Sequence, residues 1–157
     1  METLDLIDRK IIAELMRDAT VPVAQIADRV GLSQTPCWKR IQKLEAQGII
    51  TGRVARVDAR AIGFGLTVFV GIEAPAHDPD WRALFLAALD TMPEVMSAHR
   101  MAGAMDYLLR VAVPDMPAYD AFYLRLTEAV PIRNVTSHFA METLTERSAY
   151  PIDTRSR

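Results

Sequence analysis

Residues 21–48 read VPVAQIADRVGLSQTPCWKRIQKLEAQG and decide the fold of the first part of the chain. Apolar residues recur at helical spacing from Val23 to Val30, and Gly31 and Leu32 then form a corner. Ser33 is expected to cap a second helix, which runs to about residue 47. Two helices joined by a short turn that contains glycine are typical of the DNA-reading helix-turn-helix.

One face of this second helix is predicted to bind DNA. At about 100° per residue, Cys37, Ile41 and Leu44 fall on one side and would pack on the preceding helices. The opposite side is polar and basic, and such side chains address base edges and phosphates. Trp38, on the flank, either contacts a DNA sugar or seals the edge of the module. The predicted DNA-binding residues are Ser33, Gln34, Thr35, Trp38, Lys39, Arg40, Gln42, Lys43 and Arg53.

Basic residues are concentrated near this motif although the whole chain is acidic. The formal net charge is −2, yet residues 1–60 hold 10 Lys and Arg against 8 Asp and Glu. Residues 29–56 contain six basic residues and a single acid, Glu45. A local basic surface on an acidic protein is typical of site-specific DNA binders and argues against nonspecific binding of polyanions.

The remaining periodicities predict an α+β chain with two domains. A first helix spans about residues 4–16, and the alternating run 49–58 is expected to form a hairpin or wing that turns at Thr51 and Gly52. We expect strands over 66–74, 95–101, 106–114 and 135–145, and helices over 79–92, with Trp81, Leu84, Phe85, Ala88 and Leu89 inward, and 116–130. This order is the ferredoxin-like βαββαβ unit, whose sheet has one bare face that a second chain would cover. The predicted divisions are a winged helix-turn-helix at 1–58, a linker at 59–65, a ferredoxin-like effector and oligomerisation domain at 66–150, and a tail at 151–157.

Several classes of protein are disfavoured by the composition. A single cysteine precludes an internal disulfide and a cysteine-built zinc site. The N-terminus lacks the features of a signal peptide and no apolar run is long enough for a membrane span, so we expect a cytoplasmic protein. No metal, Gly-rich or nucleophile motif joins His77, His99 and His138, so we expect neither an enzyme nor a cofactor. Two alternatives stay open: an effector-independent architectural DNA-binding protein, and a small-molecule enzyme with an accessory DNA-binding module.

The loop MAGAMDY at residues 101–107 is a candidate ligand site. Gly103 permits backbone conformations in which main-chain amides approach a carboxylate, and Asp106 can accept an ammonium group. Met101 and Met105 suit a small apolar or sulfur-bearing ligand side chain, and they suit a core equally well. On spacing alone, the same residues also describe an ordinary turn with a self-bonded aspartate.

The chain as a whole resembles a known family. The run from residue 4 to residue 58 resembles the DNA-binding domain of the Lrp/AsnC (leucine-responsive, feast/famine) transcription regulators, with the closest agreement at residues 5–12 and 32–50. The segments AIGFGLTVFVGIE and MAGAMDYLLRVAVPDMPAYDAFYLRL resemble the family's effector-binding half, so the resemblance covers about residues 3–150. Within the family, TPCWKRIQKLE and SHFAMET are most similar to a branch that responds to cysteine.

This resemblance implies a function and a set of partners. A dimer would bind a pseudo-palindromic operator in double-stranded DNA, because two-fold protein symmetry imposes two-fold site symmetry. The dimers would be swapped through the N-terminal region, would pair their sheets and would assemble further into octamers, with an amino-acid effector, cysteine being one candidate, bound between dimers. In the family, the effector pocket lies at positions matched here by Gly103, Asp106 and Tyr107 and by the final strand at Thr136 and Ser137.

Overall fold

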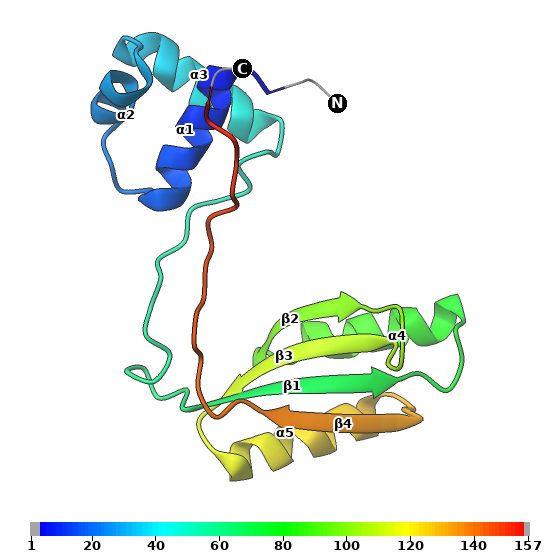
Figure 1. Cartoon of the computed structure of the whole chain (residues 1–157). Coiled ribbons are helices and arrows are strands. Elements are labelled where there is room, and N and C mark those ends of the chain that lie inside the picture. Colours follow the sequence, from blue (N-terminus) through cyan, green and yellow to red (C-terminus); the bar gives the residue numbers. More distant parts are fainter. Residues whose placement is uncertain (1–3, 156–157) are drawn as a thin grey trace. The chain divides into compact units, whose positions relative to one another are not determined.

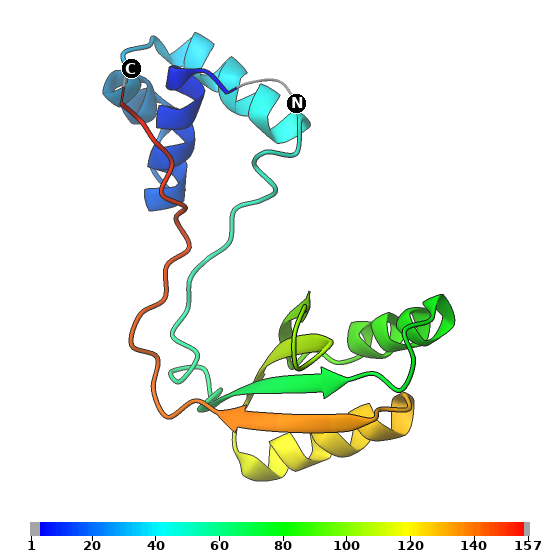
Figure 2. The same ribbon diagram turned by 45° about the vertical axis from the view of Figure 1, so that its right-hand side comes forward.

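The chain folds into two compact units. A computed structural model describes residues 4–155, so the ends of the predicted divisions, 1–3 and 156–157, lie outside the described residues. Of the described residues, one unit contains 4–55 together with 144–155, and the other contains 56–143. Two segments of chain therefore join the units (Figure 1; Figure 2). The segment from Leu144 to residue 150, which we expected to belong with the sheet, groups with the helices.

The first unit contains three helices. They are α1 (Leu6–Arg17), α2 (Val23–Val30) and α3 (Gln34–Ala46), as predicted (Figure 1). Their apolar faces meet in one core, whose buried members are Ile11, Leu15, Ile26, Ala27, Val30, Cys37, Ile41 and Leu44. The predicted inward face of α3 is thereby confirmed, and burial raises the pKa of the Cys37 thiol, so that this side chain behaves as a small core residue.

Local sequence sets the ends of these helices. The Asp5 carboxylate accepts a hydrogen bond of 2.8 Å from the Asp8 N–H and so caps α1. Gly31 ends α2 with φ of +76°, a conformation that favours glycine, and the Leu32 N–H returns to the Ala27 carbonyl at 2.9 Å. Ser33 occupies the N-cap position of α3 as predicted, but its hydroxyl forms no capping hydrogen bond. The corner between α2 and α3 is therefore held by main-chain bonds.

The hairpin expected over 49–58 does not form. Residues 51–58 contain no strand. Val54 is 87% exposed and Val57 65% exposed, so these two side chains bury little apolar area, whereas Ile50 at the start of the run packs against the helical core. A two-stranded ribbon without an apolar face to cover is marginally stable, which explains why alternation alone was insufficient here.

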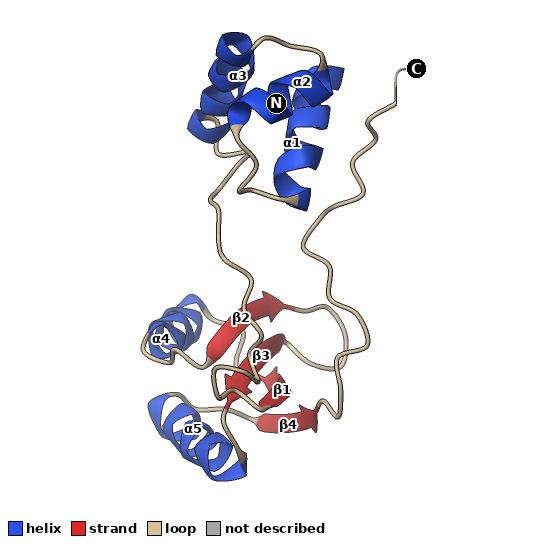
Figure 3. Ribbon diagram, turned by 90° about the vertical axis from the view of Figure 1, so that its left-hand side faces the viewer, coloured by secondary structure: helices blue, strands red, loops and turns tan. Residues whose placement is uncertain are grey.

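The second unit is the predicted α+β domain. Its elements are β1 (Leu66–Glu73), α4 (Pro79–Asp90), β2 (Val95–Arg100), β3 (Tyr107–Val113), α5 (Met116–Ala129) and β4 (Asn134–Phe139). The strands pair antiparallel in the order β2-β3-β1-β4, and both helices lie on one face of the sheet (Figure 3). The last strand ends at Phe139 rather than at residue 145, because Phe139 already pairs with Val68 near the start of β1.

Strand alternation divides the side chains between two faces. The helix-covered face is filled by buried residues: Val68, Val70 and Ile72 from β1, Leu109, Val111 and Val113 from β3, and Phe85 and Phe122 from the helices. Among the predicted inward residues of α4, Trp81, Phe85 and Ala88 are buried and Leu89 is partly buried. Leu84 is 47% exposed, so its prediction was wrong. It lies about 100° around the helix from Phe85 and thus at the margin of the inward stripe.

The opposite face of the sheet is covered by no element of its own unit (Figure 3). It presents Phe69 from β1, Leu108 and Arg110 from β3 and His138 from β4, as the register requires. Phe69 is 38% exposed. Among the described residues 4–155, no helix has the length and apolar character needed to cross a bilayer.

Candidate DNA-binding face and ligand site

The predicted DNA-binding face of α3 is open to solvent. Gln34, Thr35 and Lys39 are exposed, and so are Ser33, Gln42 and Lys43. Trp38 is 51% exposed on the flank, so it does not seal the module against the helical core. Because Gln34 and Thr35 lie in the first turn, they occupy the part of the helix that meets base edges in a helix-turn-helix. Their contact with DNA stays a prediction.

Arg40 differs from the other predicted DNA-binding residues. Its guanidinium donates hydrogen bonds to the carboxylates of Asp5, at 2.6 Å, and Asp8, at 2.7 Å, and thus joins α3 to α1. These hydrogen bonds raise the pKa of Arg40. The pKa of Asp5 is lowered, first by the hydrogen bond from the Asp8 N–H and also by Arg40. Arg40 is therefore placed to orient the helix, and a DNA contact by Arg40 would compete with these bonds.

Glu45 engages two further candidates. Its two carboxylate oxygens accept hydrogen bonds from the Gln42 amide, at 2.9 Å, and from the Arg53 guanidinium, at 2.8 Å. The only acid among residues 29–56 thus lies beside the basic surface and holds the start of the segment that follows α3. Its neutralisation of Arg53 leaves Lys39 as a more direct candidate for a phosphate contact.

The loop between β2 and β3 is a tight connection built as the sequence indicated. Gly103 has φ of +141°, where a side chain would be strained. The Met101 N–H donates to the Asp106 carbonyl at 2.8 Å, and the Asp106 N–H donates to the Ile72 carbonyl at 2.9 Å. The loop is thereby fixed to β1 as well as to its own hairpin.

Asp106 contacts a different segment from the one that a self-bonded turn would require. One carboxylate oxygen accepts a hydrogen bond of 2.8 Å from the Ala74 N–H, and the other lies 3.7 Å from Nε2 of His77. The side chain is 28% exposed. Asp106 therefore ties the loop to the connection between β1 and α4, while its second oxygen faces the imidazole ring of His77.

The other predicted effector residues lie on two faces of the sheet. The Met105 sulfur occupies the space above Gly71, 3.1 Å from where a Cβ would stand, and Gly71 pairs with Thr136. Ser137 points to the opposite side, where its hydroxyl hydrogen bonds with that of Tyr119. Burial is the main cause that raises the pKa of Tyr119. Thr136 and Ser137 therefore do not converge on one pocket within a single chain.

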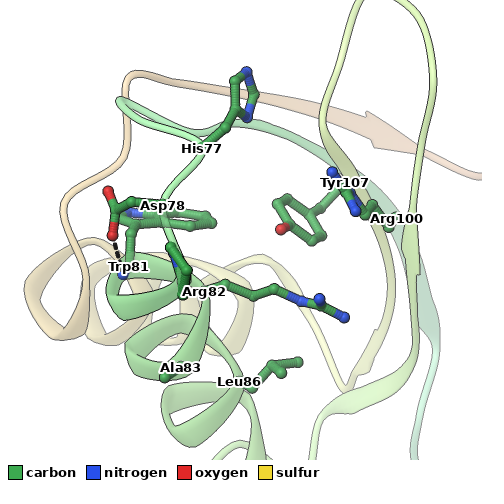
Figure 4. A pocket seen from close by; sticks show the side chains of 9 residues that line it. His77, Asp78, Trp81, Arg82, Ala83, Leu86, Arg100 and Tyr107 are labelled. Carbon is green, nitrogen blue, oxygen red and sulfur yellow. Dashed lines mark hydrogen bonds between the residues drawn. The ribbon is translucent and has the colours of Figure 1, made fainter.

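A hollow of about 370 Å³ lies on the helix-covered side, next to this loop (Figure 4). Trp81, Arg82 and Leu86 from α4 form one side of it, and Arg100 and Tyr107 from β2 and β3 form the other. His77 lies at its margin. Sequence reasoning found only Tyr107. The available signal was that Arg100 and Tyr107 flank the same loop, so that a hairpin places them opposite one another, as the register confirms. Within residues 4–155, no cluster of His, Cys, Asp and Glu has the arrangement of a metal site.

Comparison with known families agrees with both units. A family model for winged helix-turn-helix DNA-binding domains matches residues 4–51. A model for the Lrp/AsnC ligand binding domain matches residues 67–150, which is more than half of the chain. The chain belongs to the Lrp/AsnC family. The predicted resemblance to this family is thereby confirmed, as is the predicted combination of a winged helix-turn-helix with a ferredoxin-like domain.

Relatives of this Lrp/AsnC protein are transcription regulators. The chain is 47% identical over 151 residues to the DNA-binding transcriptional activator DecR of Escherichia coli strain K12, covering 96% of this chain and 99% of DecR. It is 40% identical over 149 residues to the glutamate uptake regulatory protein of Zymomonas mobilis, covering 95% of this chain and 91% of the relative. This Lrp/AsnC chain is a DNA-binding transcriptional regulator with a ligand-binding domain.

Solved structures of the family align with nearly the full length of the chain. An AsnC family regulator from Agrobacterium tumefaciens aligns with a TM-score of 0.89 at 47% identity, covering 94% of this chain and 97% of that one. A regulator from Neisseria meningitidis in complex with L-methionine aligns with a TM-score of 0.90 at 29% identity, covering 96% and 98%. The second of these structures holds an amino acid.

Proposed function

We propose that a dimer of this chain binds a pseudo-palindromic operator through α3. The observation that carries the proposal is the exposed face of that helix, with Gln34 and Thr35 in the first turn and Lys39 one turn later. Gln and Thr can hydrogen bond to base edges, and Lys can neutralise a phosphate. Ser33, Trp38 and Lys43 flank these residues, so they extend the same surface.

The uncovered sheet face supports the dimer. A four-stranded sheet with Phe69 and Leu108 on its bare face gains stability when apolar area is removed from water. A second copy offers a face of the same kind, and an isologous contact gives the two-fold symmetry that a pseudo-palindrome requires. Assembly of such dimers into an octamer is part of the proposal and follows from the family.

We propose further that an amino acid changes operator binding by changing how the dimers assemble. The family's ligand-binding domain and the L-methionine complex of the Neisseria relative support an amino-acid effector, and the similarity to a cysteine-responsive branch makes cysteine one candidate. Because Thr136 and Ser137 face opposite sides of one sheet, a pocket that used both would need a second chain. The ligand must then bind one assembly more tightly than the other.

A thermal-shift screen of the full chain against the twenty amino acids tests the effector proposal. A ligand that binds only the folded state raises the melting temperature by mass action. The same compounds are then added to the chain bound to its operator, where one of them should change the affinity or the stoichiometry. Operator binding that no amino acid alters would instead indicate an effector-independent architectural protein.

Two substitutions at Asp106 separate its possible roles. Asp106→Asn removes the charge and retains an oxygen that can accept the Ala74 N–H, whereas Asp106→Ala removes both. If the carboxylate binds the effector's ammonium group, both variants lose the effector response and keep operator affinity. Loss in Asp106→Ala alone would show that the side chain only holds the loop against the β1–α4 connection.

A further inference from the structure

We propose that the hollow between α4 and the β2–β3 hairpin binds a small carboxylic acid, with Arg82 and Arg100 holding the carboxylate. This inference rests on the proposed function, because it assigns the carboxylate-binding residues of the same ligand-binding domain. It adds two residues that the loop and the final strand do not contain. The hollow, of about 370 Å³, is large enough for a molecule of amino-acid size.

The two arginines are placed for an anion and have no anion of their own. Arg82 extends from α4 and lies below Tyr107 in the view of Figure 4, and Arg100, from β2, lies beside Tyr107. Among the described residues, neither guanidinium forms a hydrogen bond or an ion pair. By contrast, the guanidinium groups of Arg40 and Arg125 each have a carboxylate partner. A guanidinium without a partner suits a carboxylate, which can accept two parallel N–H bonds from one arginine.

The acids near the hollow are already engaged. Asp78 caps α4 by accepting the Trp81 N–H at 2.7 Å. Asp106 accepts the Ala74 N–H and faces His77. The lining of the hollow contains two arginines, Arg82 and Arg100, against one acid, Asp78, so its formal charge is positive, which favours an anionic ligand over a cationic one.

The inner wall of the hollow is aromatic. The rings of Trp81 and Tyr107 lie 5.6 Å apart, and Phe85 supports both, at 5.0 Å from Trp81 and 4.8 Å from Tyr107. Leu86 continues this apolar surface along α4. A ligand with a carboxylate at one end and an apolar or aromatic group at the other matches the arrangement. Both an L-amino acid and its 2-oxo acid have this chemistry.

The register of the β2–β3 strand pair places Arg100 and Tyr107 on the same side of the sheet. Arg100 pairs with Tyr107 across the β2–β3 ladder, so both side chains project to the helix-covered side. Arg82 reaches the same space because it follows Trp81 in the first turns of α4. The three residues are held by separate rigid elements, which is the arrangement that positions a small ligand without large reorganisation.

The test is a binding screen of the full chain with three matched sets of compounds. These are the twenty L-amino acids, their 2-oxo acids, and the corresponding amino-acid amides, which lack the carboxylate. Melting temperature identifies the compounds that bind, and calorimetry gives their Kd. We expect at least one carboxylate to bind and its amide not to bind. The compound that binds more tightly, the amino acid or the 2-oxo acid, shows which of the two chemical classes the hollow recognises.

Arg82→Gln and Arg100→Gln should each raise the Kd of that compound at least about tenfold, as expected for loss of a charge-assisted hydrogen bond. Arg133→Gln removes an exposed arginine elsewhere in the same unit and should leave the Kd unchanged. The unliganded melting temperatures of all three variants should match the original chain, since these side chains are exposed. The site is refuted if no carboxylate binds, if the amides bind equally, or if both variants bind normally. If an amino acid still binds normally to Arg82→Gln and Arg100→Gln, this site is wrong but the proposed function stands. If a carboxylate binds but does not change operator binding, the proposed function is wrong but this site stands.

Discussion

The two units of the chain build their binding surfaces in different ways. In the helical unit, α2, the Gly31 corner and α3 are contiguous, and the same 28-residue stretch supplies core residues and the exposed DNA-binding face. In the sheet unit, the hollow joins Arg82 from α4 to Arg100 and Tyr107 from a hairpin. A surface made by one contiguous stretch can be read from periodicity, whereas one assembled from separate elements depends on register and packing.

The largest expected effect is on stability, when the core residue Phe85 of the sheet unit is truncated. Phe85 also supports the aromatic side chains at the inner wall of the hollow. Phe85 is fully buried and contacts Trp81 and Tyr107. We expect Phe85→Ala to lower the free energy of unfolding by about 3–5 kcal/mol. The neighbouring Leu86 is 46% exposed, so Leu86→Ala should change it by no more than about 1 kcal/mol. Chemical denaturation measures both, and similar losses would contradict the assigned packing of α4.

The helical unit should lose DNA affinity when single charges on α3 are removed. For Lys39→Ala, the slope of the logarithm of operator affinity against the logarithm of salt concentration should fall by about one, because one phosphate contact is lost. Lys10→Ala removes the same charge from α1 and should leave the slope unchanged. Fluorescence anisotropy over a salt series gives the slopes. An unaltered slope in Lys39→Ala would show that this lysine does not contact phosphate.

Within α3, Arg40 should behave differently from Lys39, because Arg40 faces α1 whereas Lys39 is exposed. We expect Arg40→Ala to lower the free energy of unfolding by about 1 kcal/mol, since its bonds to Asp5 and Asp8 are only partly shielded from water. The salt slope of operator binding should stay the same. Arg40→Lys, which keeps the charge, should recover part of the stability. A slope reduced by about one without loss of stability would instead make Arg40 a phosphate contact.

The smallest effect concerns pH. The pKa of Asp5 is lowered from the ordinary value of 3.8, so its stabilising contribution is complete above that value and is lost as pH falls through the lower folded-state pKa. Asp5→Asn can still cap the helix and removes only the charge. Between about pH 5 and pH 2, the stability difference between Asp5→Asn and the original chain should shrink by a few tenths of a kcal/mol, about what exposed pairs contribute. A difference that is constant with pH would contradict the Asp5–Arg40 ion pair.

Sequence periodicity predicted most of the fold and part of the candidate sites. The burial of Cys37, Ile41 and Leu44 followed from helical spacing alone. The hairpin over 49–58 failed because alternation specifies a strand only where a partner and a core are available. The ion pair between Arg40 and Asp5 was missed because the two residues lie 35 positions apart in sequence, on different helical elements.

The ligand-binding half shows the same limit. The positive φ of Gly103 was implied by its place in the loop. The hydrogen bond from the Ala74 N–H to Asp106 depends on how the β2–β3 loop lies against the end of β1, and the placement of Arg82 and Arg100 around one hollow depends on strand register and helix placement. Those long-range pairings are not encoded in any local pattern.

In vitro selection of the full chain on randomised DNA duplexes tests the central claim most directly. The account predicts enrichment of a two-fold symmetric motif, because a symmetric dimer presents two copies of α3. It also predicts that the chain with Thr35→Ala and Lys39→Ala together no longer enriches this motif, while Arg133→Ala enriches it normally. Enrichment of the same motif by the α3 variant, or of no motif by the original chain, would contradict sequence-specific recognition through α3.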